Sequence, residues 1–197
     1  MIRRSTPDDF SDLIRIYAAA RSIMEQSGNP FQWGKSKPSL ELIQSDIVNG
    51  TGYLLEENGR PYGAFALLFD PDPTYSEIEG SWKNNAPYAA LHRVASDGSH
   101  KQVLSEILIF CRALSKELRI DTHEDNCIMR KLLTREGFEY CGVIHLADGS
   151  PRLAFQWSAH SSNRCLTCGI CKIDSSYINV FCCGIRYRPD RIRSGLL

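Results

Sequence analysis

Asp121 and His123 are the residues in the middle of the chain best suited to proton transfer. They stand at the end of a short segment, 118–122, that the sequence pattern predicts to be a strand. An imidazole changes its charge near neutral pH, so His123 can accept a proton from a reacting group. A solvent-exposed histidine in a turn rich in acidic residues is the alternative, and the pattern does not separate the two.

A turn that precedes an apolar helix is a candidate anion site. The chain passes from a strand that includes Val94 through Gly98 into this helix. The first N–H groups of a helix have no partner within it, and its dipole adds roughly half a positive charge. Such a site matches a pyrophosphate. The expected contacts are Ser99, Lys101, Gln102, Val103 and Leu104, with Lys101 as an additional cation. The alternative is an ordinary loop between a strand and a helix.

Three further side chains have two interpretations each. Asn126 begins the next predicted helix, where it either caps the helix or binds a ligand through its amide. Trp33 and Trp82 lie in two loops, where they either form the wall of a substrate pocket or pack beneath the loop. His92 is expected to point into or across the sheet rather than toward a ligand.

The eight cysteines fall into two groups. Cys111, Cys127 and Cys141 stand in apolar segments and are expected to be buried free thiols. The other five lie beyond residue 157, in a basic segment. Four of these cysteines could bind one zinc ion through their thiolates: Cys165, Cys168, Cys182 and Cys183. The neighbours Cys182 and Cys183 fit a single tetrahedral site poorly. We therefore expect a cysteine-rich extension without metal.

Local signals define the elements that would position these residues. Thr6 and Asp9 form a capping pair around Pro7. Asn58-Gly59 predicts a hairpin turn, and Gly137 predicts a helix end. The expected strands are 1–5, 52–57, 60–69, 88–95, 118–122, 138–146 and 152–157; the expected helices begin at Thr6, Ser39, Val103 and Asn126. Hairpins at both ends, with strand–helix alternation between them, predict a mixed sheet of about seven strands with helices on its faces.

Two segments resemble the GNAT N-acetyltransferase family, and the resemblance extends over residues 1–157. The first is the strand and turn from Val94 to Leu104. The second is the helix that opens with Asn126 and ends in Gly137-Phe138. The stretches 119–126 and 148–155 are similar to one bacterial branch of the family. This resemblance implies an α/β fold with a GNAT-like mixed, largely antiparallel twisted sheet and about four helices.

The resemblance also implies a reaction, the transfer of an acetyl group from acetyl-CoA to a primary amine by direct attack in a ternary complex. The edge of the strand Val94, Ala95 and Ser96 would pair with the pantetheine arm, and Asn126 and Met129 would contact the same ligand. Asp121 and His123 would then lie near the acceptor amine, and Trp33 and Trp82 would flank it.

The chain departs from the family pattern at several positions. Gln102 and Leu104 stand where the family has two glycines, and Ser99 stands where it has Arg or Gln. Leu133 replaces a tyrosine that would protonate the CoA thiolate. These departures favour one alternative, a non-catalytic module that senses acyl-CoA. A second alternative is a metal-binding regulatory protein that acts through the cysteine-rich segment.

Composition limits the partners. The 23 basic and 23 acidic residues balance, which gives no reason to expect a nucleic acid or an anionic membrane as a partner. The apolar runs are too short to span a bilayer, and the N-terminus does not have the pattern of a secretory signal, so a cytoplasmic protein is expected. We expect a GNAT domain at 1–157, an extension at 158–197, and a small-molecule or peptide amine as acceptor. The sequence is compatible with a homodimer.

Overall fold

The computed structural model describes residues 1–159 of the 197-residue chain. The expectations for Cys165 and the cysteines after it fall outside the described residues. In chain order the elements are β1 (Ile2–Arg4), the 3-10 helix η1 (Pro7–Asp9), α1 (Phe10–Gln26), α2 (Leu40–Val48), β2 (Gly52–Glu57), β3 (Arg60–Leu68), the 3-10 helix η2 (Pro73–Tyr75), β4 (Glu79–Gly80), β5 (Ala89–Ser96), α3 (Val103–Leu114), β6 (Glu117–Thr122), α4 (Cys127–Arg135), β7 (Glu139–His145) and β8 (Pro151–Ser158).

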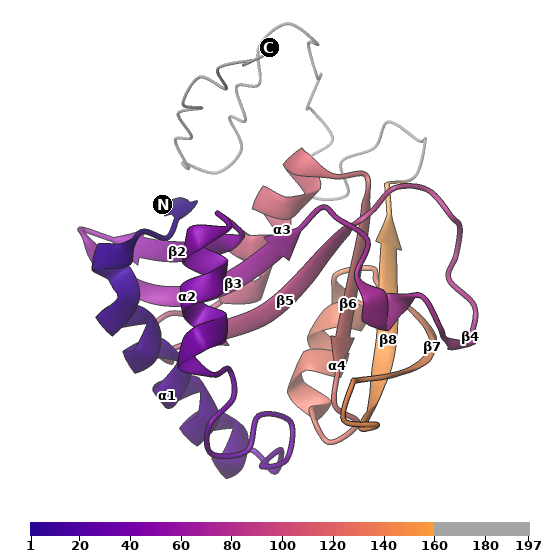
Figure 1. Ribbon diagram of the computed structural model, residues 1–197, viewed down its shortest axis with the longest axis horizontal. Helices are drawn as coiled ribbons and strands as arrows, with labels where there is room; N and C mark the ends of the chain where they lie inside the picture. Colours follow the sequence, from indigo (N-terminus) through magenta and orange to yellow (C-terminus); the bar gives the residue numbers. More distant parts are fainter. Residues whose placement is uncertain (160–197) are drawn as a thin grey trace, which may run out of the picture. The chain divides into compact units, whose positions relative to one another are not determined.

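The strands of this part of the chain form one eight-stranded sheet in the order β1-β2-β3-β5-β6-β8-β7-β4 (Figure 1). β5 and β6 are parallel, and the other neighbouring pairs are antiparallel. The expected α/β fold with a mixed, largely antiparallel sheet is confirmed. The additional strand is β4, which pairs with β7 through Glu79 and Gly80 in a segment expected to be a loop.

Local signals account for several element boundaries. The backbone N–H of Thr6 donates to Asp9 Oδ2 at 2.8 Å, which is one half of the expected capping pair. Ser39 Oγ accepts from the N–H of Leu42 at 3.3 Å and begins α2. Asn58 and Gly59 both have positive φ angles, 51° and 74°, as the tight turn between β2 and β3 requires.

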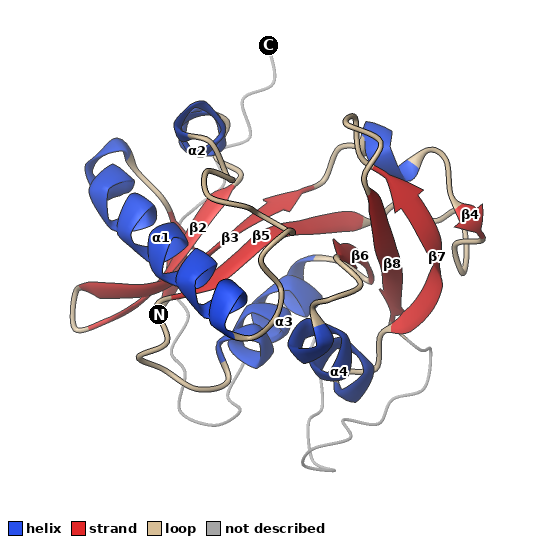
Figure 2. Cartoon of the chain, turned by 90° about the horizontal axis from the view of Figure 1, so that it is seen from below, coloured by secondary structure: helices blue, strands red, loops and turns tan. Residues whose placement is uncertain are grey.

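Helices cover both faces of the sheet (Figure 2). Alternation along β2 shows how: Tyr53 and Leu55 belong to the core cluster that contains α3 residues, whereas Leu54 belongs to the cluster that contains α1 residues. α4 adds Leu133 to the first cluster, and α2 adds Ile43 to the second. The sheet therefore separates an α1–α2 layer from an α3–α4 layer.

β5 and β6 separate soon after they begin, as Figure 1 shows. They pair only through Ala89 with Leu118 and Ala90 with Arg119. On its other side, β5 stays paired with β3 as far as Ser96. The β6-facing edge of β5 is therefore without a β6 partner from Leu91 onward, and this opening positions the candidate site.

A bulge in β5 lies beside this opening. Ala64 pairs with Ala95 and Ala66 with His92, so Arg93 and Val94 together face one residue of β3. Arg93 has a φ of 55°, a left-handed conformation that costs a residue with a Cβ roughly 1–2 kcal/mol. Its Nε and Nη2 donate to the two carboxylate oxygens of Asp46 in α2 at 2.7 and 2.8 Å. This ion pair ties the bulge to α2.

The three described cysteines are free thiols. Cys111 and Cys141 are buried, as expected, and burial raises the pKa of Cys111 to about 12. The expectation for Cys127 is wrong, because this residue is exposed. Cys127 is the first residue of α4, where its side chain lies on the solvent side of the helix.

Candidate functional site

The sheet register places three polar side chains on one face. Asp121 is opposite Ala154 in the β6–β8 pair, so Arg152, two residues from Ala154, lies on the same face as Asp121. Ala90 is paired with Arg119, so His92 and Asp121, each two residues further on, share that face as well. Alternate neighbours of these residues, Leu91 and Ile120 among them, pack in the α3–α4 core.

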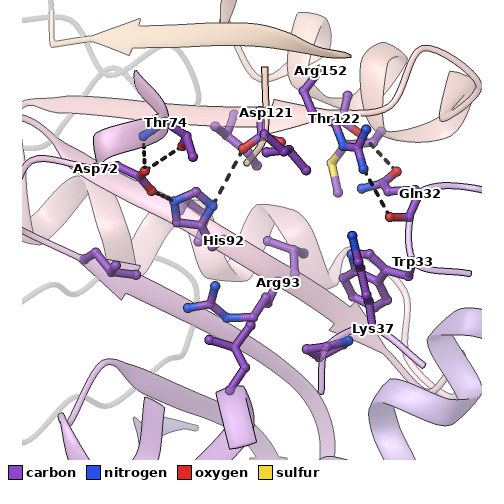
Figure 3. Close-up of a pocket in the computed structure, with 18 of the residues that line it drawn as sticks. Gln32, Trp33, Lys37, Asp72, Thr74, His92, Arg93, Asp121, Thr122 and Arg152 are labelled. Atoms are coloured by element: carbon purple, nitrogen blue, oxygen red, sulfur yellow. Dashed lines mark hydrogen bonds and ion pairs between the residues drawn. The ribbon is translucent and has the colours of Figure 1, made fainter. Parts of the chain in front are cut away.

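A cavity of about 450 Å³ opens between β5 and β6, lined by these polar side chains and also by Leu91 and Ile120 from the alternate positions. Figure 3 shows its walls: the loop before α2, the segment after β3, β5, β6 and the start of β8. Trp33 and Lys37 come from the loop before α2, and His92, Asp121 and Arg152 come from the sheet. The volume suits a small ligand.

His92 lies between two carboxylates in this cavity. Its Nε2 is 2.7 Å from Asp72 Oδ2, and its Nδ1 is 3.7 Å from Asp121 Oδ1. Asp72 also accepts from the backbone N–H of Thr74 at 2.8 Å. The expectation that His92 points into or across the sheet is wrong, because the pairing of Ala90 with Arg119 turns this side chain toward the cavity.

The surroundings of Asp72 and Tyr75 define where protons reside. Burial by itself would raise the pKa of Asp72, but the hydrogen bonds from His92 and Thr74 outweigh it and hold the pKa below the usual range. An ionised Asp72 accepts a hydrogen bond from the N–H at His92 Nε2, which leaves Nδ1 as an acceptor in the neutral imidazole. Burial and the nearby Asp121 raise the pKa of Tyr75 well above its usual value. Tyr75 therefore keeps its proton and donates to Asp121 Oδ1 at 2.8 Å.

Asp72→Asn is expected to reduce the acid sensitivity of the fold. The folded-state pKa of Asp72 is depressed, so its carboxylate stabilises the protein fully above the unfolded pKa of about 4 and loses this effect as the pH falls toward the folded pKa. Free energies of unfolding from urea titrations should therefore differ most between wild type and variant at neutral pH, and less below about pH 4. A difference that stays constant with pH would contradict the expectation.

The residues expected from sequence to act in catalysis or to flank the acceptor separate into two groups. Asp121 and Trp33 line the cavity, and Trp33 also packs edge-on against Tyr17 with ring centroids 5.7 Å apart. His123 does not line it; its Nδ1 accepts from the N–H of Asp125 at 3.2 Å within their own turn. Trp82 packs beneath the loop, with the Arg119 guanidinium 4.1 Å from its ring centroid.

The expected pantetheine contacts lie along the open edge of β5. Val94 and Met129 line the cavity. Ala95 is buried against the α1–α2 core, and Ser96 pairs with Gly63 of β3. The edge of this segment that faces away from β3 is the edge that β6 leaves without a partner, so backbone groups there are available to an extended ligand.

The turn before α3 is organised by Asp97 and Gln102. Asp97 Oδ1 accepts from the N–H of Ser99 at 3.0 Å. Gln102, the N-cap of α3, has a φ of 64°, which lies in the left-handed region. The first bond within α3 runs from Glu106 to the Gln102 carbonyl, which leaves the N–H groups of Val103 and Leu104 ahead of the helix ladder. Lys101 is exposed beside them.

Substitution by glycine is expected to change the stability of the fold in opposite directions at positions 102 and 104. Gln102→Gly removes left-handed strain of roughly 1–2 kcal/mol and adds backbone entropy of roughly 0.5–1 kcal/mol to the unfolded chain, so stability should rise slightly. Leu104 is only 6% exposed, and Leu104→Gly should cost about 2–5 kcal/mol. Urea titrations of the two single variants measure the contrast, and equal destabilisation would contradict it.

Asn126 caps α4. Its Oδ1 accepts from the N–H of Met129 at 3.0 Å, and its Nδ2 donates to Gln32 Oε1 at 2.9 Å. Gln32 Oε1 also accepts from Thr122 Oγ1 and from Asn29 Nδ2. The cap is one of the two roles expected for Asn126, and its contact with a ligand stays a prediction.

Sequence reasoning missed four residues of the site. Asp72 and Tyr75 stand at the two ends of a segment expected to be an irregular loop, and His92 and Arg152 were not expected to face a cavity. The sequence does carry a signal for the segment from Asp72 to Tyr75. Asp72-Pro73 repeats the cap-plus-proline pattern of Thr6-Pro7, and it begins the 3-10 helix η2 in the same way.

The side chains and helices of residues 1–159 bear on metal binding and on membrane crossing. No group of three or more His, Cys, Asp or Glu side chains is arranged to hold a metal ion within this range. Among the same residues, no helix combines the length and the apolar character needed to cross a membrane.

The fold of the described residues is similar to the folds of solved GNAT acetyltransferases. A GNAT-family acetyltransferase from Streptococcus agalactiae is 28% identical to this chain, with a TM-score of 0.71 over 80% of this chain and 94% of that protein. A GNAT-family acetyltransferase from Listeria monocytogenes is 20% identical, with a TM-score of 0.62 over 80% and 94%. A ribosomal-protein-alanine N-acetyltransferase from Brucella melitensis is 19% identical, with a TM-score of 0.52 over 80% and 99%.

These structures confirm the resemblance to the GNAT family. The likeness to the Streptococcus agalactiae protein supports acetyltransferase activity in general. No family model matches the sequence, and no curated protein is significantly similar to it.

Proposed function

We propose that this protein transfers the acetyl group of acetyl-CoA to a primary amine of a small molecule or peptide. The observation that carries the proposal is the position of His92, which lines the cavity at the point where β5 and β6 separate. An imidazole there would meet an amine next to a thioester lying along the open edge of β5. Its two neighbouring carboxylates, Asp72 and Asp121, favour a cationic amine at the same place.

The positions of His92 and Asp121 support the following sequence of steps. An ammonium group donates to His92 Nδ1 and Asp121 Oδ1, two acceptors 3.7 Å apart, and loses one proton to His92. The neutral nitrogen attacks the thioester carbonyl carbon, a C–N bond forms, and the C–S bond breaks. The attacking nitrogen then loses its second proton, which passes through water to the thiolate, so that CoA leaves as a thiol. The proton taken up by His92 is released to solvent. The products are an amide and free CoA.

Several residues act through their neighbours. Asp72 holds the His92 tautomer that leaves Nδ1 free to accept a proton. Tyr75 orients Asp121 through its hydroxyl.

Backbone groups would contact acetyl-CoA directly. A backbone N–H of Val94 or Ala95 would polarise the thioester carbonyl. The turn from Ser99 to Leu104 would hold the pyrophosphate through main-chain N–H groups, because the side chains of Val103 and Leu104 are buried.

Positioning supplies the largest share of the expected rate enhancement. Holding an amine and a thioester together in one cavity can lower the barrier by about 7–11 kcal/mol. A general base such as His92 adds about 10²–10⁴-fold. We further propose a cytoplasmic location, which is consistent with the three free thiols Cys111, Cys127 and Cys141.

One observation favours a second function, the sensing of acyl-CoA without turnover. Leu133 occupies the place of the tyrosine expected to protonate the CoA thiolate, and it is fully buried in the α3–α4 core. The resemblance therefore supplies no acid at this position. A protein that binds acetyl-CoA and releases no CoA with any amine would have this second function.

Two measurements test the proposal. Acetyl-CoA and CoA should each raise the melting temperature of the full chain, because a ligand that binds only the folded state stabilises it. Release of free thiol from acetyl-CoA should then require an added amine. A panel of amines, amino acids and short peptides identifies the class of acceptor. If neither CoA species shifts the melting temperature, both acetyl transfer and acyl-CoA sensing are excluded.

A further inference from the structure

The cations of the cavity wall differ in how their charge is balanced. Lys37 Nζ pairs with Asp148 at 3.0 Å, and Arg93 pairs with Asp46 through two hydrogen bonds. Arg152 is only 5% exposed, and within residues 1–159 no carboxylate lies within ion-pair distance of it. Its guanidinium donates instead to two main-chain carbonyls, Pro151 at 2.8 Å and Gln32 at 3.3 Å.

A buried guanidinium without a counter-ion is unfavourable. Removing a charge from water costs several kcal/mol unless an opposite charge compensates it. The Arg152 guanidinium has five N–H donors, and its hydrogen bonds to the two carbonyls leave some of these donors for another acceptor. Because Arg152 lines the cavity, a ligand in the cavity is placed to supply the missing negative charge.

The two ends of the cavity have opposite character. Figure 3 shows Arg152 across the cavity from His92 and Asp72, with Asp121 between them along the wall. The His92 end presents two carboxylates, which repel an anion and attract an ammonium. The Arg152 end presents a cation. A ligand with both charges would therefore bind in one orientation, with its amine at His92.

We propose that the acceptor is a small amine that also carries a carboxylate, of the amino-acid type, and that Arg152 binds this carboxylate. This inference rests on the proposed acetyl transfer and specifies its acceptor. A guanidinium matches a carboxylate geometrically through two parallel hydrogen bonds. Arg152 supplies one unbalanced positive charge, which equals the charge of a carboxylate and is half that of a phosphate dianion.

The test compares matched pairs of acceptors with the full-length protein. Each L-amino acid is assayed beside its carboxamide, together with β-alanine, 4-aminobutyrate and phosphoethanolamine, by thiol release from acetyl-CoA. We expect kcat/KM to be about 10- to 100-fold higher for the preferred acid than for its amide, the range of one charged hydrogen-bonded contact. Binding of the same compounds without acetyl-CoA is measured by calorimetry.

Two variants assign the preference to Arg152. Arg152→Gln should bring the ratio of acid to amide close to one, mainly through a higher KM for the acid. Arg152→Lys should keep only part of the preference, because lysine keeps the positive charge but lacks the planar guanidinium. Lys131→Gln, which removes an exposed cation from α4, is the matched control and should leave the ratio unchanged. Circular dichroism establishes that each variant is folded.

The outcomes separate this inference from the proposed function. Equal acetylation of acids and amides by the wild type would overturn the inference and leave acetyl transfer in place. A preference for phosphoethanolamine, or an acid preference that survives Arg152→Gln, would overturn it as well. If no amine is acetylated, calorimetry decides: amino acids that bind wild type and not Arg152→Gln support the carboxylate site, and no binding to either overturns it.

Discussion

Replacing His92 with glutamine is expected to lower kcat by about 10²–10⁴-fold, the usual contribution of a general base. Glutamine keeps the size of the side chain and can still donate to Asp72, but it cannot accept a proton from the amine. Steady-state thiol release at saturating acetyl-CoA measures the effect. The Kd for acetyl-CoA, from calorimetry, should change little, because the imidazole faces the acceptor cavity.

Two other histidines make this test specific. His145→Gln is the matched control, because His145 is exposed and pairs with Glu79 away from the cavity. His123→Gln examines the residue that the sequence offered as a candidate for proton transfer. If His123→Gln lowered kcat as strongly as we expect for His92→Gln, and His92→Gln left kcat unchanged, the base would be His123.

Asp46→Ala is expected to destabilise the fold by about 3 kcal/mol, because it leaves the partly buried Arg93 guanidinium without its counter-ion. The loss corresponds to a fall in melting temperature of about 6–12 °C for a domain of this size. Arg93→Gly should also destabilise the fold, because it relieves the left-handed strain at φ 55° but leaves the buried Asp46 carboxylate without its counter-ion. Thermal unfolding followed by circular dichroism measures both.

The control for Asp46→Ala is an exposed ion pair. Asp12 and Arg15 contact each other at 2.9 Å on the surface of α1, where both side chains are about 40% exposed. Asp12→Ala should cost at most about 1 kcal/mol. If Asp46→Ala were no more harmful than Asp12→Ala, the bulge would not depend on its ion pair with α2.

Local chemistry made most of the fold predictable. The capping pair at Thr6, the N-cap at Ser39, the turn at Asn58-Gly59 and the helix end at Gly137 each act within a few residues, so each can be recognised in sequence. The bulge could not be recognised in this way. Arg93 has no intrinsic preference for a positive φ, and its conformation depends on Asp46, 47 residues away in the chain.

The site was less predictable than the fold because it depends on register. Alternation shows that His92 and Leu91 face opposite sides of β5, but it does not show where β5 and β6 separate. That is determined by two pairings with β6, Ala89 with Leu118 and Ala90 with Arg119. Asp121 could be selected from its place at a strand end, whereas Arg152 requires the β6–β8 register.

The hydrogen bonds of Gln32 have a consequence for how strongly the two ligands bind in each other's presence. Its side-chain oxygen joins the wall of the acceptor cavity to the cap of α4, where it accepts from Asn126. A ligand carbonyl that accepted from Asn126 Nδ2 would displace Gln32 and loosen the segment that carries Trp33 and Lys37. By thermodynamic reciprocity, acceptor and acetyl-CoA would then change each other's affinity by the same factor. A Kd for the acceptor that changes when CoA is bound, and that no longer changes in Gln32→Ala, would reveal this coupling.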